Sequence, residues 1–236
     1  MILKKVEDAI EFHDENSNSF KNKYNTNSDF IQRYKIWSFL FSKYLKPEQR
    51  VLDVGCGSGI FSLLALNSYN CYVTGIDASS KMIELCLEQV SENNKNRLNF
   101  ILGNVPFDLP IDVGSFDIVF SSSVLEYIEN VDETILKIKN LLVERNGLFI
   151  LSVPNGSSYY RRLERSIFYF VKFPKYYKHV KNVYNRKSFI RYICSFGFEF
   201  LELEYYANTN AVSRILKRIL PKQYVSNLMV GVFKVK

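Results

Sequence analysis

The sequence predicts an α/β fold, in which a mostly parallel sheet carries helices on both faces. Short apolar segments of strand length alternate along the chain with segments of helical periodicity, which is the order that a parallel sheet requires. A glycine-rich turn joins the first such strand to the first such helix. The length of 236 residues and the hydrophobic content of 47% suit one compact domain with a large core.

The glycine turn at residues 55–59 is the most specific feature of the chain. It follows an apolar strand at residues 51–54 and precedes a helix that begins at Ile60. Glycine lets the backbone turn sharply and approach a ligand closely, so this is a nucleotide-type binding turn at the carboxyl edge of a sheet. The spacing excludes a dinucleotide fingerprint, because Ile60 stands at the sixth position, and a Walker loop, because no Gly-Lys-Ser/Thr ending follows.

A second apolar strand covers residues 71–76 and is followed by Asp77. In an open α/β sheet the carboxyl end of this strand lies beside that of the first strand, so Asp77 is placed to accept hydrogen bonds from a ribose diol. An Asp in such a loop can instead cap the helix expected at residues 80–90. The neighbouring glycine turn favours ribose binding.

The remaining elements are expected in an order that completes the sheet. Glycine, proline and asparagine mark their boundaries, and hydrophobic periodicity gives their type. The expected elements are a third strand at residues 98–102, a fourth at 115–120, a helix at 131–143, a fifth strand at 148–153, a helix at 187–196, a sixth strand at 198–206 and a last strand at 224–235.

The chain resembles the class I S-adenosylmethionine-dependent methyltransferases. Their first motif is similar to Asp53-Val54-Gly55-Cys56-Gly57-Ser58-Gly59, and their second is similar to the segment from Gly75 to Met82. The resemblance covers residues 12–236. It implies a Rossmann-like fold with a mostly parallel seven-stranded sheet and an antiparallel last strand. It also implies S-adenosyl-L-methionine as methyl donor and S-adenosyl-L-homocysteine as product.

The resemblance also assigns residues to the donor. Asp77 would hold the ribose and Met82 would pack on the adenine. Asn104 stands where the family usually carries an Asp that meets the adenine amino group, and its side-chain carbonyl can still accept that hydrogen bond. Tyr127 replaces the usual His after strand four, which removes one candidate base. An amphipathic segment at residues 12–45 should cover the donor. The expected donor contacts are Asp53, Gly55, Cys56, Gly57, Gly59, Asp77, Ala78, Met82, Asn104, Val105, Ser121, Glu126, Tyr24 and Arg33.

The composition of the chain limits its possible domain organisation and cellular location. A single methyltransferase domain is expected, with a helical cover at residues 1–46, a donor-binding core at 47–156, an insert or lid at 157–187 and a C-terminal helix with edge strands at 188–236. No apolar run approaches the ~20 residues that span a bilayer, and the charged N-terminus does not resemble a secretory signal, so a cytoplasmic location is expected. The cysteines show no paired ligand spacing, so no metal is expected.

The positive charge is concentrated in the insert. Residues 161–191 hold 10 basic and 1 acidic side chains, a net charge of +9, whereas residues 1–160 have a net charge of −5. Aromatic residues are interleaved with these cations. The segment could be an interfacial helix on an anionic membrane, a nucleic-acid surface, or a lid over an apolar or anionic acceptor. It could equally pack its aromatics on the sheet and leave its lysines solvated.

Methyl transfer is an in-line displacement that depends mainly on alignment and exclusion of water. A hydroxyl acceptor also benefits from a general base, and His is the side chain best suited to that role near neutral pH. His13 lies in the N-terminal segment, where a structural or exposed position is the simpler interpretation. His179 lies in the insert beside the presumed acceptor pocket and is the candidate catalytic base, with a plain surface histidine as the alternative.

Three functions follow from these observations. The first is biosynthetic O-methylation of a small-molecule acceptor, such as a natural product, quinone-like compound or sugar, since the segment from Ser152 to Asn155 and the Gly197-Phe198 pair resemble the ubiquinone-pathway branch. The second is an RNA or protein methyltransferase that docks through the insert. Nucleic acid is less expected, because Ser121-Ser122-Ser123-Val124 replaces an amine-methylating Asn-Pro-Pro-Tyr-like tetrad. The third is a non-catalytic cofactor-binding partner subunit.

Overall fold

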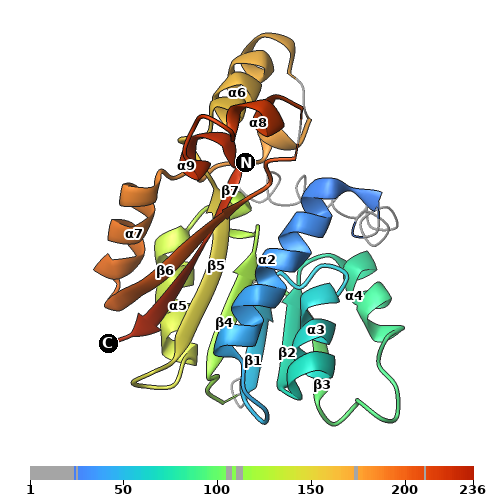
Figure 1. Ribbon diagram of the computed structural model, residues 1–236. Coiled ribbons are helices and arrows are strands. Elements are labelled where there is room, and N and C mark those ends of the chain that lie inside the picture. Colours follow the sequence, from blue (N-terminus) through green and yellow to red (C-terminus); the bar gives the residue numbers. More distant parts are fainter. Residues whose placement is uncertain (1–23, 25, 105–107, 110–113, 173–174, 210) are drawn as a thin grey trace.

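The computed structural model describes residue 24 and residues 26–104, 108–109, 114–172, 175–209 and 211–236. Within these ranges the chain builds a seven-stranded sheet of order β3-β2-β1-β4-β5-β7-β6 (Figure 1). The strands are β1 (Arg50–Val54), β2 (Tyr72–Asp77), β3 (Leu98–Leu102), β4 (Ile118–Ser122), β5 (Leu148–Pro154), β6 (Phe198–Tyr206) and β7 (Leu228–Val235).

The first five strands are parallel, whereas β7 runs antiparallel to both β5 and β6. This confirms the predicted α/β fold class and its antiparallel last strand. β4 is buried along its whole length, as expected for a central parallel strand with helices on both faces. Its apolar residues therefore contribute to the cores on both sides of the sheet.

Helices cover the two faces of the sheet. The first face carries α2 (Ser28–Tyr44), α3 (Ile60–Tyr69) and α4 (Ser80–Leu87), and its core includes Trp37 and Phe61. The second face carries the short helix η1 (Leu125–Tyr127), α5 (Val131–Leu141) and α7 (Arg186–Ser195), and its core includes Ile135 and Phe189. The remaining helices are α6 (Tyr159–Val171), η2 (Lys175–Lys178), α8 (Ala211–Leu216) and α9 (Lys222–Val225).

Several predicted boundaries need correction. The last strand begins at Leu228 rather than at Tyr224, because Pro221 precedes the helical turn α9 and the chain extends only after it. The helix expected at residues 80–90 ends at Leu87. In the N-terminal cover, the helix α2 starts after Asn27, whose side chain accepts hydrogen bonds from the first turn. Residues 1–23, including His13, lie outside the described residues.

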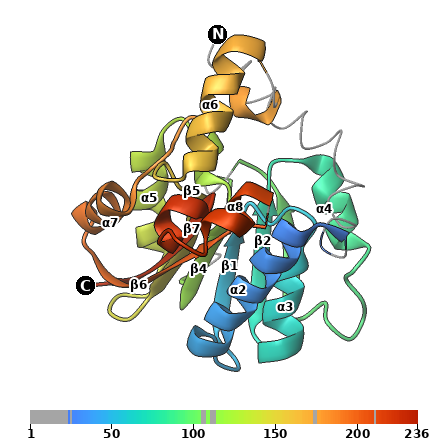
Figure 2. The ribbon, with the colours of Figure 1, turned by 45° about the horizontal axis from the view of Figure 1, so that its top comes forward.

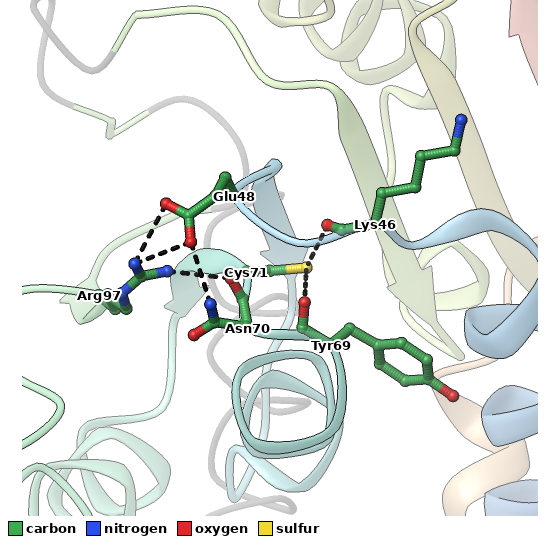
Figure 3. Close-up of polar contacts among 6 residues, drawn as sticks. All are labelled: Lys46, Glu48, Tyr69, Asn70, Cys71 and Arg97. Carbon is green, nitrogen blue, oxygen red and sulfur yellow. Dashed lines mark hydrogen bonds and ion pairs between the residues drawn. The ribbon is translucent and has the colours of Figure 1, made fainter.

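A polar network joins the elements at the amino ends of the strands. Arg97 forms an ion pair with Glu48 at 2.8 Å and donates to the Asn70 carbonyl at 3.0 Å, and the Asn70 side chain donates to Glu48 Oε1 at 3.0 Å (Figure 3). The buried Cys71 thiol donates to the Lys46 carbonyl at 3.4 Å. These contacts fix the turn that leads into β1 against the ends of α3 and the loop before β3.

The aromatic residues of α6 do not pack into the core of the sheet. α6 contains no buried residue, and Figures 1 and 2 show it projecting from the end of the molecule beyond the carboxyl ends of the strands. The alternative in which the aromatics of this helix pack on the sheet is therefore wrong. Within the described residues, no helix has the length and apolar character needed to cross a membrane.

Candidate functional site

The glycine loop turns tightly between β1 and α3. Its three glycines have positive φ angles between 53° and 75°, a conformation that side chains with a Cβ rarely adopt. The backbone N–H groups of Gly55 and Cys56 both donate to the Ile76 carbonyl, at 2.8 and 3.0 Å. A Cβ on Gly55 would lie 2.3 Å from Val124 Cγ2. Packing therefore requires a glycine at this position, and hydrogen bonds fasten the loop to the end of β2.

Gly57 lies at the centre of the loop. A Cβ added to Gly57 would meet no atom of the described residues within 4 Å. Its N–H donates to Asp77 Oδ2 at 2.8 Å, and Asp77 Oδ1 accepts from the Ser79 N–H at 2.9 Å. The partly exposed Asp77 carboxylate is thus held facing the loop at the carboxyl edge of the sheet. Two neighbouring strand ends therefore place a glycine backbone and a carboxylate around one opening.

The helix-cap alternative for Asp77 is wrong. Ser79 is the N-cap of α4, and its hydroxyl accepts from the Met82 N–H at 3.1 Å. Asp77 instead supports the turn before the helix. Met82 is buried in the first turn of α4, and Ala78 lies half-exposed beside Asp77. Of these predicted donor contacts, Asp77 and Ala78 retain accessible surface.

Asp53 lies beneath the glycine loop and is buried. Its Oδ2 accepts a hydrogen bond from the Ser62 hydroxyl at 2.6 Å, which connects β1 to the first turn of α3. Burial raises the pKa of the Asp53 carboxyl to about 7, against a smaller lowering by the Ser62 hydrogen bond. The nearby Asp77 carboxylate also raises this pKa, whereas the Arg33 guanidinium lowers it. Asp53 and Asp77 therefore influence one another electrostatically across the loop.

A second buried acid, Glu126, lies on η1 after β4. Its Oε2 has no hydrogen-bond partner among the residues that the structure describes. Burial raises the pKa of Glu126 to about 7, and the guanidinium groups of Arg33 and Arg161 act in the opposite direction. Cations from two other elements, α2 and α6, therefore act on the charge of Glu126.

Arg33 fixes α2 to the end of β4. Its guanidinium donates to Ser122 through Nε and Nη2, at 3.0 and 2.6 Å from the hydroxyl and 2.5 Å from the carbonyl. Tyr24 packs edge-on against Phe61 with ring centroids 5.9 Å apart. Burial raises the pKa of Tyr24, and the charge of Arg33 lowers it. The structure thus brings Tyr24 and Arg33 together near Asp53, as the sequence analysis grouped them.

Other predicted contacts have structural partners. Ser121 is buried and donates to the Val54 carbonyl at 3.1 Å, which ties β4 to β1. Cys56 is buried beside Cys86, whose thiol donates to the Gly57 carbonyl at 3.1 Å. These side chains shape the floor of the opening and have little surface of their own to offer.

The third strand end differs from the first two. Asn104 is exposed just after β3, and its backbone N–H donates to Asp108 Oδ2 at 2.7 Å. Its side chain is therefore available on the same edge of the sheet as Asp77. Val105 lies outside the described residues.

The end of the insert closes onto η1. The N–H of Lys181 donates to the Glu126 carbonyl at 2.7 Å, and the Asn182 side chain donates to the carbonyls of Leu125 and Ile128, each at 2.8 Å. We call residues 181–182 the strap. His179, half-buried, lies two residues before Lys181. The strap therefore holds the segment that carries the candidate base against η1.

Ser122 and Asn182 are contacts that sequence analysis missed. Ser122 is hydrogen-bonded to Arg33, which lies 89 residues earlier in the chain, and Asn182 is hydrogen-bonded to Leu125, which lies 57 residues earlier. Hydrophobic periodicity carries no information on such distant pairing. Asn182 stands in a charged run with no local pattern that distinguishes it.

Comparison with protein families gives a direct match. A family model described as a methyltransferase domain matches residues 45–195. Among curated relatives, the ribosomal protein L11 methyltransferase of Thermosipho melanesiensis is 31% identical over 121 residues, which cover 50% of this chain and 43% of that protein. The O-methyltransferase rstn1 of Aspergillus nomiae is 33% identical over 95 residues, 40% of this chain and 42% of that protein. The matched region thus spans less than half the length of either relative.

Solved structures share the fold over most of the chain. One chain of a complex between the Haloferax volcanii Trm112 methyltransferase activator and a methyltransferase aligns with a TM-score of 0.68 and 15% identity, covering 94% of this chain and 97% of that one. The magnesium protoporphyrin IX methyltransferase of Synechocystis, solved with bound SAH, aligns with a TM-score of 0.62 and 16% identity, covering 86% and 81%. At such identities the likeness establishes the common fold.

Proposed function

This chain belongs to the class I S-adenosylmethionine-dependent methyltransferases, and from that premise we propose that it methylates a hydroxyl group of a small-molecule acceptor. S-adenosyl-L-methionine supplies the electrophilic methyl group of the reaction. The protein has to bind this donor, align the acceptor with the methyl group, exclude water and remove the hydroxyl proton.

The juxtaposition of Asp77 and Gly57 carries the proposed donor site. A carboxylate at the end of β2 suits a ribose diol, because its two oxygens offer paired acceptors. Among the residues that the structure describes, none crowds Gly57, which supports passage of the donor close to the backbone. The exposed side chain of Asn104 supports adenine binding farther along the same edge. We assign the ribose to Asp77, the adenine amino group to Asn104 and the floor of the site to the glycine loop.

The acceptor is proposed to bind between η1, the strap and α6. Polar and charged groups gather there around Glu126, whose Oε2 faces no donor among the described residues. The likeness to an O-methyltransferase and the serine run after β4 support a hydroxyl acceptor over an amine. His179 is proposed as the base that takes the hydroxyl proton, and the contacts of the strap with η1, two residues farther along the chain, support this choice.

Methyl transfer to a panel of phenols, quinols and sugars, followed by release of S-adenosylhomocysteine, tests this function. His179→Asn should lower kcat by about 100-fold and remove a limb of the pH profile, while leaving the affinity for S-adenosylmethionine unchanged. His13→Asn, at the other histidine of the sequence, is the matched control.

Three other results would contradict parts of the proposal. An unchanged kcat and pH profile in His179→Asn would remove His179 from the proposal. Transfer to RNA or protein substrates alone would overturn the small-molecule assignment. Donor binding without turnover on any acceptor pool would favour a non-catalytic partner subunit.

A further inference from the structure

The helix α6 is amphipathic, with its apolar side turned away from the protein. Leu163, Ile167 and Phe170 follow one another at helical spacing and therefore lie on one face. They are 54%, 41% and 80% exposed. Isolated exposed apolar residues are common on protein surfaces, but a continuous outward-facing apolar helix stripe indicates an interaction site.

The opposite face of α6 supplies the contacts with the protein. Arg161 donates through Nε to the Asn227 carbonyl at 3.4 Å and pairs with Glu164 of the same helix at 3.3 Å, and the two side chains are only 13% and 15% exposed. Phe168 packs against Tyr177 of η2 with ring centroids 5.5 Å apart. Ser158, the N-cap of α6, donates to Asn227 Oδ1 at 2.8 Å. The orientation of α6 is therefore set by contacts on its inner face, which leave the apolar stripe exposed.

A second exposed apolar pair lies at the same end of the molecule. Ile215 on α8 is 68% exposed and Ile219, just after it, is 76% exposed. Figures 1 and 2 place α8 with α6 beyond the carboxyl ends of the strands. We call Leu163, Ile167, Phe170, Ile215 and Ile219 the apolar tip.

Exposed cations lie on the same segments as the apolar tip. The exposed basic residues of α6 and of the segment that includes α8 extend the net charge of +9 carried by residues 161–191. They are Arg162, Arg165, Lys172, Arg214, Lys217 and Arg218. Exposed apolar side chains on helices that also carry exposed lysine and arginine are the pattern of a surface that lies on anionic lipid, with the apolar groups in the acyl boundary and the cations at the headgroups.

We propose that the apolar tip and the exposed cations of the same segments dock this protein peripherally on an anionic membrane surface. Aliphatic side chains such as Leu163 and Ile215 have no counterpart on a phosphate backbone, which argues against nucleic acid. A second copy would bring two equally cationic surfaces together and is disfavoured by repulsion. An anionic bilayer satisfies both the apolar and the charged components of the surface. This inference concerns the location of the enzyme and does not depend on the identity of the acceptor.

Co-sedimentation of the full chain with lipid vesicles tests the proposal. Binding to phosphatidylcholine vesicles that contain phosphatidylglycerol should exceed binding to phosphatidylcholine alone and should weaken as salt rises. The double variant Leu163→Ser/Ile167→Ser should reduce the partition coefficient by about tenfold or more, because two side chains no longer enter the lipid. Arg162→Gln/Arg165→Gln should reduce the preference for anionic vesicles.

Leu136→Ser is the matched control, since Leu136 is a similarly exposed residue, at 49%, on the distant helix α5. Equal losses in the Leu136 variant and the α6 double variant would overturn the proposal. So would binding to RNA that the α6 variants weaken while vesicle binding is absent. Titration with S-adenosylmethionine in the same variants separates this inference from the proposed function, because donor binding should be retained even where vesicle binding is lost.

Discussion

The backbone N–H of Gly57 donates to Asp77 Oδ2 over 2.8 Å, which joins the glycine loop after β1 to the last residue of β2. The bond orients the carboxylate over the loop before any ligand arrives. Each carboxylate oxygen can accept more than one hydrogen bond, so this contact is compatible with binding of a ribose diol. Pre-orientation of this kind lowers the entropic cost of donor binding.

Two glycines of the loop should respond differently to alanine. Gly57→Ala should lower stability by only about 1 kcal/mol, the strain of a Cβ at positive φ, because the added methyl meets no atom of the described residues. The same methyl should obstruct the donor and weaken S-adenosylmethionine binding by at least about tenfold. Gly55→Ala should unfold at a clearly lower temperature, since its methyl would collide with Val124. Thermal melts measure the stability of the two variants, and calorimetric titration measures their affinity for the donor. Undiminished donor affinity in Gly57→Ala would contradict the proposed site.

Stability of the ligand-free protein should fall as pH rises from acid to neutral. The folded pKa values of Asp53 and Glu126, each about 7, exceed their ordinary values of 3.8 and 4.5. The folded state therefore binds these protons more tightly, so this stabilisation is complete at low pH and is lost as pH rises towards 7. Each group contributes a slope on the order of 1 kcal/mol per pH unit in that window.

Urea unfolding across this pH window measures the effect. Asp53→Asn and Glu126→Gln should each flatten the dependence, because neither amide titrates. A wild-type slope that neither buried-acid variant alters would rule out the raised pKa values.

Arg33 and Arg97 offer a matched pair of arginines. Arg33→Met should destabilise the protein by about 2 kcal/mol, because the buried Ser122 would lose its hydrogen-bond donors. Arg97→Met, at the more exposed network of Figure 3, should cost at most about 1 kcal/mol. Chemical denaturation of the two variants compares them directly, and equal losses would show that Arg33 does not anchor α2 to β4.

Local signals in the sequence identified most of the sheet. Strands such as β1 and β5 are short apolar runs bounded by glycine, proline or charged residues, and those boundaries determine where they end. The strand expected from Tyr224 was wrong because an aromatic and β-branched pair also suits a buried helical turn, and only Pro221 indicated the difference. The local sequence also allowed Asp77 to cap α4, but the neighbouring Ser79 is the N-cap.

The face of α6 that is exposed to solvent could not be predicted from the sequence. Helical periodicity shows that Leu163 and Ile167 share a face, but it does not say whether that face meets the protein or the solvent. The answer depends on contacts from distant segments, such as Tyr177 with Phe168 and Asn227 with Ser158. The pairing of Arg33 with Ser122 escaped prediction for the same reason.

Calorimetric titration with S-adenosylmethionine tests the proposed donor site most directly. The wild type should bind the donor at one site, and Asp77→Ala should lose about tenfold to hundredfold in affinity, since the hydrogen bonds to a charged acceptor are removed. Asp132→Ala, which removes a carboxylate from α5, should bind as the wild type does. An Asp77→Ala protein that remains folded and binds with wild-type affinity, or a wild type that does not bind the donor, would contradict the account.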